Sequence, residues 1–104
     1  MKMDLIYIRD ESRAATFHIA TEWLFDSRVR AFLGQCVIVR AERSFCLGDT
    51  VLYEAFHPDL PPCSMVQGWP TKWVSIGSDG RIRFCDDRST LPDGCVELWS
   101  RPVV

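Results

Sequence analysis

The chain has 104 residues, a length typical of one domain and too short for two independent hydrophobic cores. Its hydrophobic fraction of 47% and charged fraction of 25% are those of a globular protein and exclude an intrinsically disordered chain. The formal net charge of -2 excludes a protein that holds nucleic acid by bulk positive charge, so any nucleic-acid site must be local.

Membrane insertion and secretion are disfavoured by the same sequence. No apolar run reaches the roughly 18 residues of a membrane-spanning helix, and the apolar stretch near the N-terminus is too short and too acidic for a signal peptide. The 5 cysteines are odd in number and lack the spacing of a secreted disulfide framework. We therefore expect a cytoplasmic protein with no membrane partner and with mostly free thiols.

The first elements in chain order are two predicted strands. Residues 3–8 are apolar and β-branched enough for a strand, and the charged residues 9–13 end it. Residues 16–20 predict a second, short strand.

One amphipathic helix is predicted at about residues 21–33. Apolar side chains recur there at helical spacing, at Phe25, Val29, Phe32 and Leu33. Thr21 is the expected N-cap, and Gly34 stands where a left-handed C-cap belongs.

The rest of the chain predicts strands and turns. We expect strands at residues 36–41, 50–56, 72–76, 81–85 and 95–99. The pair Asp79-Gly80 predicts a hairpin between two of these strands. Residues 57–71 carry four prolines and form the longest expected loop, which is where we first expect a functional site.

These elements predict an α+β fold in a single domain over residues 1–104. Five to six strands with one helix, and no alternation of strands with helices, favour a small, mostly antiparallel β-barrel that the helix covers.

A run of residues beginning at His18 resembles the ASCH domain, a branch of the PUA-like barrels, and in particular its small bacterial and phage members. The pattern comprises His18, the helix, Gly34, Arg40 and the turn Arg43-Ser44-Phe45-Cys46-Leu47-Gly48-Asp49. The resemblance covers about residues 18–58 and implies a PUA-like barrel; an SH3-like barrel is the alternative architecture.

The resemblance implies binding of RNA or of a modified base. The lysine and glutamate that are catalytic in family members with amidohydrolase activity are not matched here, because Gln35 and Cys36 follow the helix and Ile38 precedes Arg40. A binding fold without catalytic residues is therefore expected. An amidohydrolase with substituted residues is an alternative to the two binding hypotheses given below.

Five residues are the candidate ligand-binding positions. Arg40 and Arg43 are expected near the barrel mouth, where a guanidinium can pair with phosphate or stack on a base. Trp69, Lys72 and Trp73 combine aromatic rings with a cation at the end of the Pro-rich loop. The alternatives are solvated arginines in local ion pairs and tryptophans that pack the core and the loop.

Other candidate sites favour structural explanations. His57 with Cys63 and the remaining cysteines has no zinc-ligand spacing, and a Cys-His nucleophile needs a proximity that the sequence does not establish. Asp86 and Asp87 fit a solvated turn beside Arg83 and Arg88. We expect no metal, no cofactor and no catalytic constellation.

Two functional hypotheses follow. The first is a non-catalytic binding module that recognises RNA, a nucleotide or a modified base. The second is a small protein-interaction factor, such as a phage-type inhibitor or adaptor, that uses its acidic surface and the aromatic Pro-rich loop.

Overall fold

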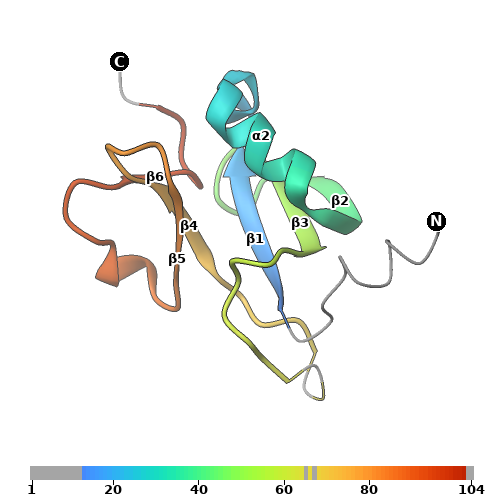
Figure 1. Ribbon diagram of the computed structural model, residues 1–104. Helices are drawn as coiled ribbons and strands as arrows, with labels where there is room; N and C mark the ends of the chain where they lie inside the picture. The colour runs from blue at the N-terminus through green and yellow to red at the C-terminus, as the bar shows by residue number, and fades with distance from the viewer. Residues whose placement is uncertain (1–12, 65, 67, 103–104) are drawn as a thin grey trace, which may run out of the picture.

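The computed structural model describes residues 13–64, 66 and 68–102, and its elements are arranged in two β-sheets with one α-helix (Figure 1). The elements in chain order are β1 (Ala14–Ala20), the 3-10 helix η1 (Thr21–Phe25), α2 (Ser27–Gln35), β2 (Val37–Ser44), β3 (Thr50–Phe56), β4 (Trp73–Ile76), β5 (Ile82–Cys85), the 3-10 helix η2 (Arg88–Thr90) and β6 (Val96–Glu97). The strand expected at residues 3–8 lies outside the described residues.

The first sheet has the order β1-β3-β2, with both pairs antiparallel. The central strand β3 has the bounds expected from its alternation of Val51, Tyr53 and Ala55 with Leu52 and Glu54. A β-bulge between Ile38 and Arg40 interrupts the pairing of β2 with β3. Because β2 pairs with β3 alone in the described part of the chain, it is an edge strand.

The second sheet has the order β5-β4-β6, again with antiparallel pairs. The predicted hairpin at Asp79-Gly80 is confirmed, because β4 and β5 flank this turn. The Gly77 N–H donates to the Arg81 carbonyl at 2.9 Å, and the Gly80 N–H donates to the Gly77 carbonyl at 2.9 Å. Gly80 has a φ of 80°, a conformation in which an L side chain is strained, so glycine suits this turn.

Strand β1 joins the two sheets. The Thr16 N–H donates to the Pro70 carbonyl at 2.8 Å, and the Lys72 N–H donates to the Thr16 carbonyl at 2.9 Å. Further along β1, the Ala20 N–H donates to the Leu98 carbonyl at 2.7 Å. The α+β class with mostly antiparallel strands is confirmed, and the described strands form no closed barrel.

The helical region differs from the single helix expected at residues 21–33. It is divided at Asp26, whose extended backbone separates η1 from α2 and whose side chain accepts hydrogen bonds from the Arg28 and Val29 N–H groups. Asp26, and not Thr21, is therefore the N-cap of α2. Gly34 lies inside α2 instead of ending it, and Phe25 is 87% exposed because the break turns it away from the core.

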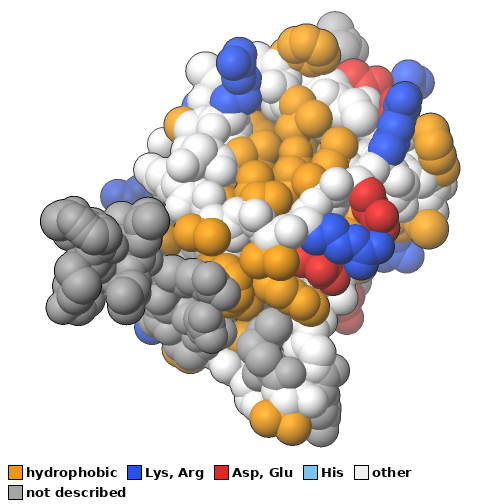
Figure 2. Space-filling model, turned by 90° about the vertical axis from the view of Figure 1, so that its right-hand side faces the viewer, with side chains coloured by type: hydrophobic (Ala, Val, Ile, Leu, Met, Phe, Trp, Pro, Cys, Tyr) orange, Lys and Arg blue, Asp and Glu red, His pale blue; other side chains and the backbone are white. Residues whose placement is uncertain are grey.

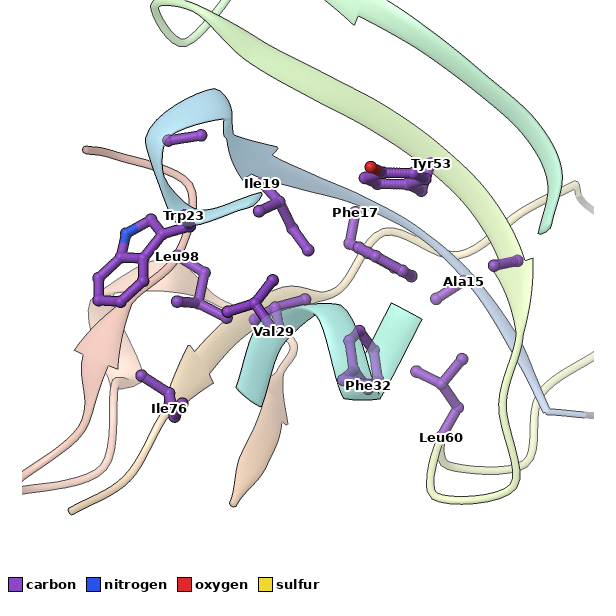
Figure 3. Packing of buried hydrophobic residues seen from close by; sticks show 13 residues of the cluster. Ala15, Phe17, Ile19, Trp23, Val29, Phe32, Tyr53, Leu60, Ile76 and Leu98 are labelled. Carbon is purple, nitrogen blue, oxygen red and sulfur yellow. The ribbon is translucent and has the colours of Figure 1, made fainter. Parts of the chain in front are cut away.

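The core lies between α2 and the two sheets (Figure 3). Phe17 of β1 is fully buried between two aromatic neighbours, with ring centroids 5.6 Å from Tyr53 of β3 and 5.8 Å from Phe32 of α2. Val74 of β4 and Leu98 extend the same cluster into the second sheet. Burial of this shared cluster stabilises both sheets together.

Candidate functional site

The predicted site residues lie mainly on the face of the first sheet that is turned away from α2. Phe17 and Ile19 of β1 pack in the core, so the alternate residues Thr16 and His18 point to the opposite face. Arg40 is on this opposite face because it is in register with Glu54 and, through β3, with Thr16.

Arg40 and Arg43 are not brought together. Arg43 is in register with Val51, which belongs to the core side, so the two guanidinium groups start from opposite faces of β2. Arg40 forms ion pairs with Glu42 and, at 3.7 Å, with Glu54. The charge of Arg40 is thus compensated on its own face.

Arg43 also has a carboxylate partner. Its Nε and Nη2 atoms donate to the two carboxylate oxygens of Asp49, each at 2.9 Å, and its guanidinium lies 5.1 Å from the Phe45 ring centroid. This bidentate pair lowers the pKa of the Asp49 carboxyl below its usual value. The expected alternative, a solvated arginine in a local ion pair, describes Arg43.

Trp73 lies in an aromatic cluster. Its ring is stacked near His18 with centroids 6.5 Å apart, meets Trp99 edge-on at 5.2 Å, and has the Arg88 guanidinium 5.3 Å from its centroid. The neighbouring Lys72 forms an ion pair with Asp86. The rings around Trp73 already occupy positions that a stacked base would need.

Trp69 packs the Pro-rich loop onto the first sheet. Its ring centroid is 5.4 Å from that of Phe56 in β3. It is half-buried and lies one residue before Pro70, whose carbonyl is bonded to β1. The loop-packing alternative therefore describes Trp69.

His18 contributes an unusual buried polar atom. No described residue forms a hydrogen bond with its Nδ1, although that atom is buried. Burial lowers the pKa of the imidazole below 6.5, so the ring is neutral at pH 7. A buried polar atom without a hydrogen-bond partner destabilises a protein core, and such atoms often mark functional sites.

A cavity with a partly polar lining lies elsewhere, between α2 and the β4–β5 turn. Its volume is about 390 Å³. We call it the α2 groove and define it by six of its lining residues, Arg28, Phe32, Gln35, His57, Asp59 and Arg81. A cavity of this size fits a small ligand.

His57 is the buried wall of the α2 groove. Its Nδ1 accepts a hydrogen bond from the Asp59 N–H at 3.0 Å, so the ring proton is on Nε2 and is donated to the Gln35 side-chain oxygen at 3.1 Å. Burial lowers the pKa of His57, and the nearby Asp59 carboxylate only partly opposes this shift. The imidazole is therefore neutral. Its hydrogen bond to the Gln35 side-chain oxygen orients the Gln35 amide so that the N–H₂ group remains able to donate.

Two arginines provide the positive charge of the α2 groove. Arg28 bonds to Asp26 through Nε at 3.1 Å and Nη2 at 2.8 Å. Arg81 is exposed and has no ion-pair partner among the described residues. The groove thus offers one guanidinium that is bonded to a carboxylate and one that interacts with the nearby Asp79 carboxylate only at longer range.

A second cavity of about 330 Å³ lies at the other end of β1, beside Trp99. Its polar lining is mixed, because Glu22 and Asp49 face it together with Arg101. Asp49 is already bonded to Arg43 and Thr21. This cavity offers an anion less positive charge than the α2 groove.

The remaining candidate site residues form contacts that explain them as structural residues. All five cysteines carry free thiols, and burial raises the pKa of Cys36 to about 12, which keeps that thiol protonated. The Cys63 thiol donates to the Ala14 carbonyl at 3.5 Å, away from the hydrogen bonds of His57. Asp87 accepts from the Ser89 N–H at 2.9 Å and begins η2, so it belongs to a turn.

Two further findings concern metals and membranes. Within residues 13–64, 66 and 68–102, no three His, Cys, Asp or Glu side chains gather as ligands for a metal ion. None of the described helices combines the length and the apolar composition that a bilayer crossing requires.

Sequence reasoning missed the α2 groove because its walls come from three separate segments. His57 and Asp59 begin the Pro-rich loop, which was expected to contain a site, but Gln35 was considered only as the residue in place of a lysine. Arg81 was considered only as a strand residue. Their spatial convergence has no signal in the local pattern.

Comparisons with known proteins found no matching family model, no matching curated protein and no matching solved structure. The function is therefore argued from the geometry of the chain itself.

Proposed function

We propose that this protein is a non-catalytic binding module that recognises a nucleotide in the α2 groove. The observation that carries the proposal is the exposed Arg81 guanidinium, without an ion-pair partner among the described residues, at the mouth of a cavity of about 390 Å³. An arginine whose N–H donors are not held in an ion pair is suited to bind phosphate through two parallel N–H donors.

The fold is compatible with this proposal. Two antiparallel sheets joined along β1, with a helix packed across the core, support the β-rich part of this expectation, and a PUA-like barrel is the architecture that the ASCH resemblance implies. Members of that group bind RNA or modified bases. The barrel is therefore part of the proposal. Two joined sheets are also compatible with other small β-folds.

A mononucleotide fits the charges better than an RNA strand does. Binding along an RNA backbone needs several cations free to replace counterions. Arg40, Arg43 and Lys72 instead form ion pairs with carboxylates. One phosphate needs only the Arg81 and Arg28 end of the groove.

The other walls of the α2 groove suit a base. Phe32 and Ile82 supply apolar surface, and the Gln35 amide, oriented by His57, supplies hydrogen-bond donors. Asp59 at the rim can accept a hydrogen bond from an exocyclic amino group or a ribose hydroxyl. These contacts supply affinity and selectivity for a ligand that the protein binds without changing it.

Isothermal titration calorimetry with the four ribonucleoside monophosphates and with short single-stranded RNA tests the proposal. We expect saturable binding of at least one mononucleotide, weakened roughly ten- to a hundredfold in Arg81→Gln, since a hydrogen bond to a charged group contributes about 1.5–3 kcal/mol. Arg30→Gln is the matched control, because Arg30 is an exposed arginine of α2 outside the groove. Absence of heat with all ligands, or equal weakening by both variants, would contradict the proposal.

A protein-interaction factor is the second candidate function. The observation that favours it is Val66 in the Pro-rich loop, which is 91% exposed and belongs to the same loop as the exposed Pro61 and Pro62. An apolar side chain presented on a proline-rich loop is suited to insert into a partner's pocket. Val66→Asp should then abolish stoichiometric copurification of one protein, and Phe25→Asp, which changes an equally exposed apolar residue on η1, should retain it.

A further inference from the structure

Strand β2 leaves one long edge without a partner strand in the described part of the chain. It has eight residues, of which the six from Ile38 to Arg43 are exposed, and it pairs with β3 alone. Ile38 and Val39 are 43% and 55% exposed, and Phe45, just beyond the strand, is 68% exposed. An edge strand that is both long and partly apolar is a ready template for pairing with another strand.

The surface around this edge combines apolar and charged side chains. Figure 2 shows the side of the molecule that lies to the right in Figure 1; hydrophobic side chains gather near the middle of this view, and basic and acidic side chains lie around them. Such a mixed surface is typical of an interface with an apolar centre and a polar rim.

The charges of β2 are self-complementary. Arg40 and Glu42 point to the same face of the strand and flank the small, exposed Ala41. If two β2 strands lie antiparallel about a two-fold axis at Ala41, Arg40 of each copy is opposite Glu42 of the other. Because directly opposite residues share a face, both oppositely charged pairs form on the same side of the joined sheet.

We propose that β2 is a self-association edge through which two copies of this chain form a continuous six-stranded sheet. The two-fold symmetry at Ala41 makes the same residues serve both sides of the interface. Backbone hydrogen bonds between the strands supply affinity, and the Arg40–Glu42 pairs fix the register.

The apolar ends of the edge agree with this register. Exposed apolar side chains lie on both sides of the charge pairs, with Val39 before Arg40 and Phe45 just after the strand. Aromatic and β-branched pairs across strands are favourable. Because of the bulge at Val39, regular pairing in this register is limited to Arg40, Ala41 and Glu42 of each copy, and these residues include both charge pairs.

The Arg40–Glu42 pattern favours a second copy over other occupants of the edge. An unrelated strand would need the inverse order of charges, whereas the second copy supplies it by symmetry. In the single chain Arg40 contacts its own Glu42 and Glu54. On association it exchanges Glu42 of its own strand for that of the other copy and retains Glu54.

Sedimentation velocity over a range of protein concentrations tests this proposal with two charge-reversal variants. The full chain is expected to reach twice its mass of 11.9 kDa, and Arg40→Glu and Glu42→Arg are each expected to remain monomeric because like charges then oppose each other. An equimolar mixture of the two variants is expected to form a heterodimer, since one strand then carries two carboxylates and the other two guanidinium groups. Circular dichroism verifies that both variants are folded.

Arg30→Glu is the matched control, because it reverses an exposed arginine that belongs to α2 and not to β2, and it should leave the dimer intact. A full chain that stays monomeric at every concentration would overturn the proposal. So would single variants that still dimerise, or folded variants whose mixture stays monomeric. A chain that dimerises only after deletion of residues 1–12 would also overturn it, because its own N-terminal segment would then be the occupant of the edge.

Discussion

At the scale of single residues, Asp26 shows how one side chain sets a local structure. Its carboxylate accepts the Arg28 N–H at 2.8 Å and the Val29 N–H at 3.4 Å, and it also binds the Arg28 guanidinium. The side-chain hydrogen bond to Arg28 is the main cause that lowers the pKa of Asp26 to about 2. The ionised form is therefore the one that the folded state prefers.

Replacement of Asp26 by alanine should lower the free energy of unfolding at pH 7 by about 1 kcal/mol, the usual effect of losing an N-cap. Because its pKa is lower in the folded state than the usual 3.8, the charge contribution is present above about pH 4 and is lost as the pH falls through about 2. Urea unfolding measured across this range should show a weaker acid dependence in Asp26→Asn, which keeps a capping oxygen but has no charge. An unchanged acid dependence in Asp26→Asn would show that other carboxylates dominate.

At the scale of elements, two glycines in different settings should respond oppositely to alanine. Gly80 in the β4–β5 turn has a φ of 80°, whereas Gly34 lies inside α2, where an added Cβ would meet no atom within 4 Å. Gly80→Ala should destabilise the fold by about 1–2 kcal/mol because of the left-handed backbone. Gly34→Ala should stabilise it by about 0.5–1 kcal/mol because alanine favours the helix. Guanidinium unfolding curves of the two variants measure both changes in the free energy of unfolding. Destabilisation by Gly34→Ala would contradict the helical setting of that residue.

The strands were predictable from the sequence where alternation and turn chemistry agree. The strand Thr50–Phe56 and the hairpin at Asp79-Gly80 have both signals, and the structure places them as expected. The predicted start of the helix lies too early in the sequence, because Phe25 fits the helical spacing of the apolar residues. The competing signal was the Asp26-Ser27 pair, whose capping hydrogen bonds end η1 and start α2.

The candidate sites were less predictable than the strands. Alternation placed Arg40 and Trp73 on strands, but the carboxylates and rings that surround them come from distant segments, as Arg88 over Trp73 illustrates. The α2 groove depends on how the β4–β5 turn packs beside α2, and that packing is decided by the whole core. A local pattern therefore nominates residue types but not their neighbours.

At the scale of the whole molecule, Leu98 connects the parts of the core. Its side chain is fully buried, its N–H donates to the Val74 carbonyl at 3.0 Å and its carbonyl accepts from the Ala20 N–H at 2.7 Å. It thus bridges β4 of the second sheet to β1 of the first.

Leu98→Ala should lower the free energy of unfolding by about 2–5 kcal/mol, the range for removal of a buried leucine side chain. Because the two sheets share one core, tryptophan fluorescence and far-ultraviolet circular dichroism should report a single transition in both the parent chain and the variant. Val96→Ala, at a partly exposed position of β6, is the control and should cost much less. Two separate transitions would show that the sheets unfold independently.

The position of β1 also has a consequence for the order of events during folding. This strand is made before the other described strands, yet Thr16 pairs with the segment around Thr71 and Ala20 with Leu98, both far along the chain. Contacts between such distant segments form slowly, because a long loop must close before they are gained. A nascent chain that ends before Leu98 lacks part of the core that covers β1, so we expect ribosome-bound intermediates to bind chaperones until Leu98 has emerged.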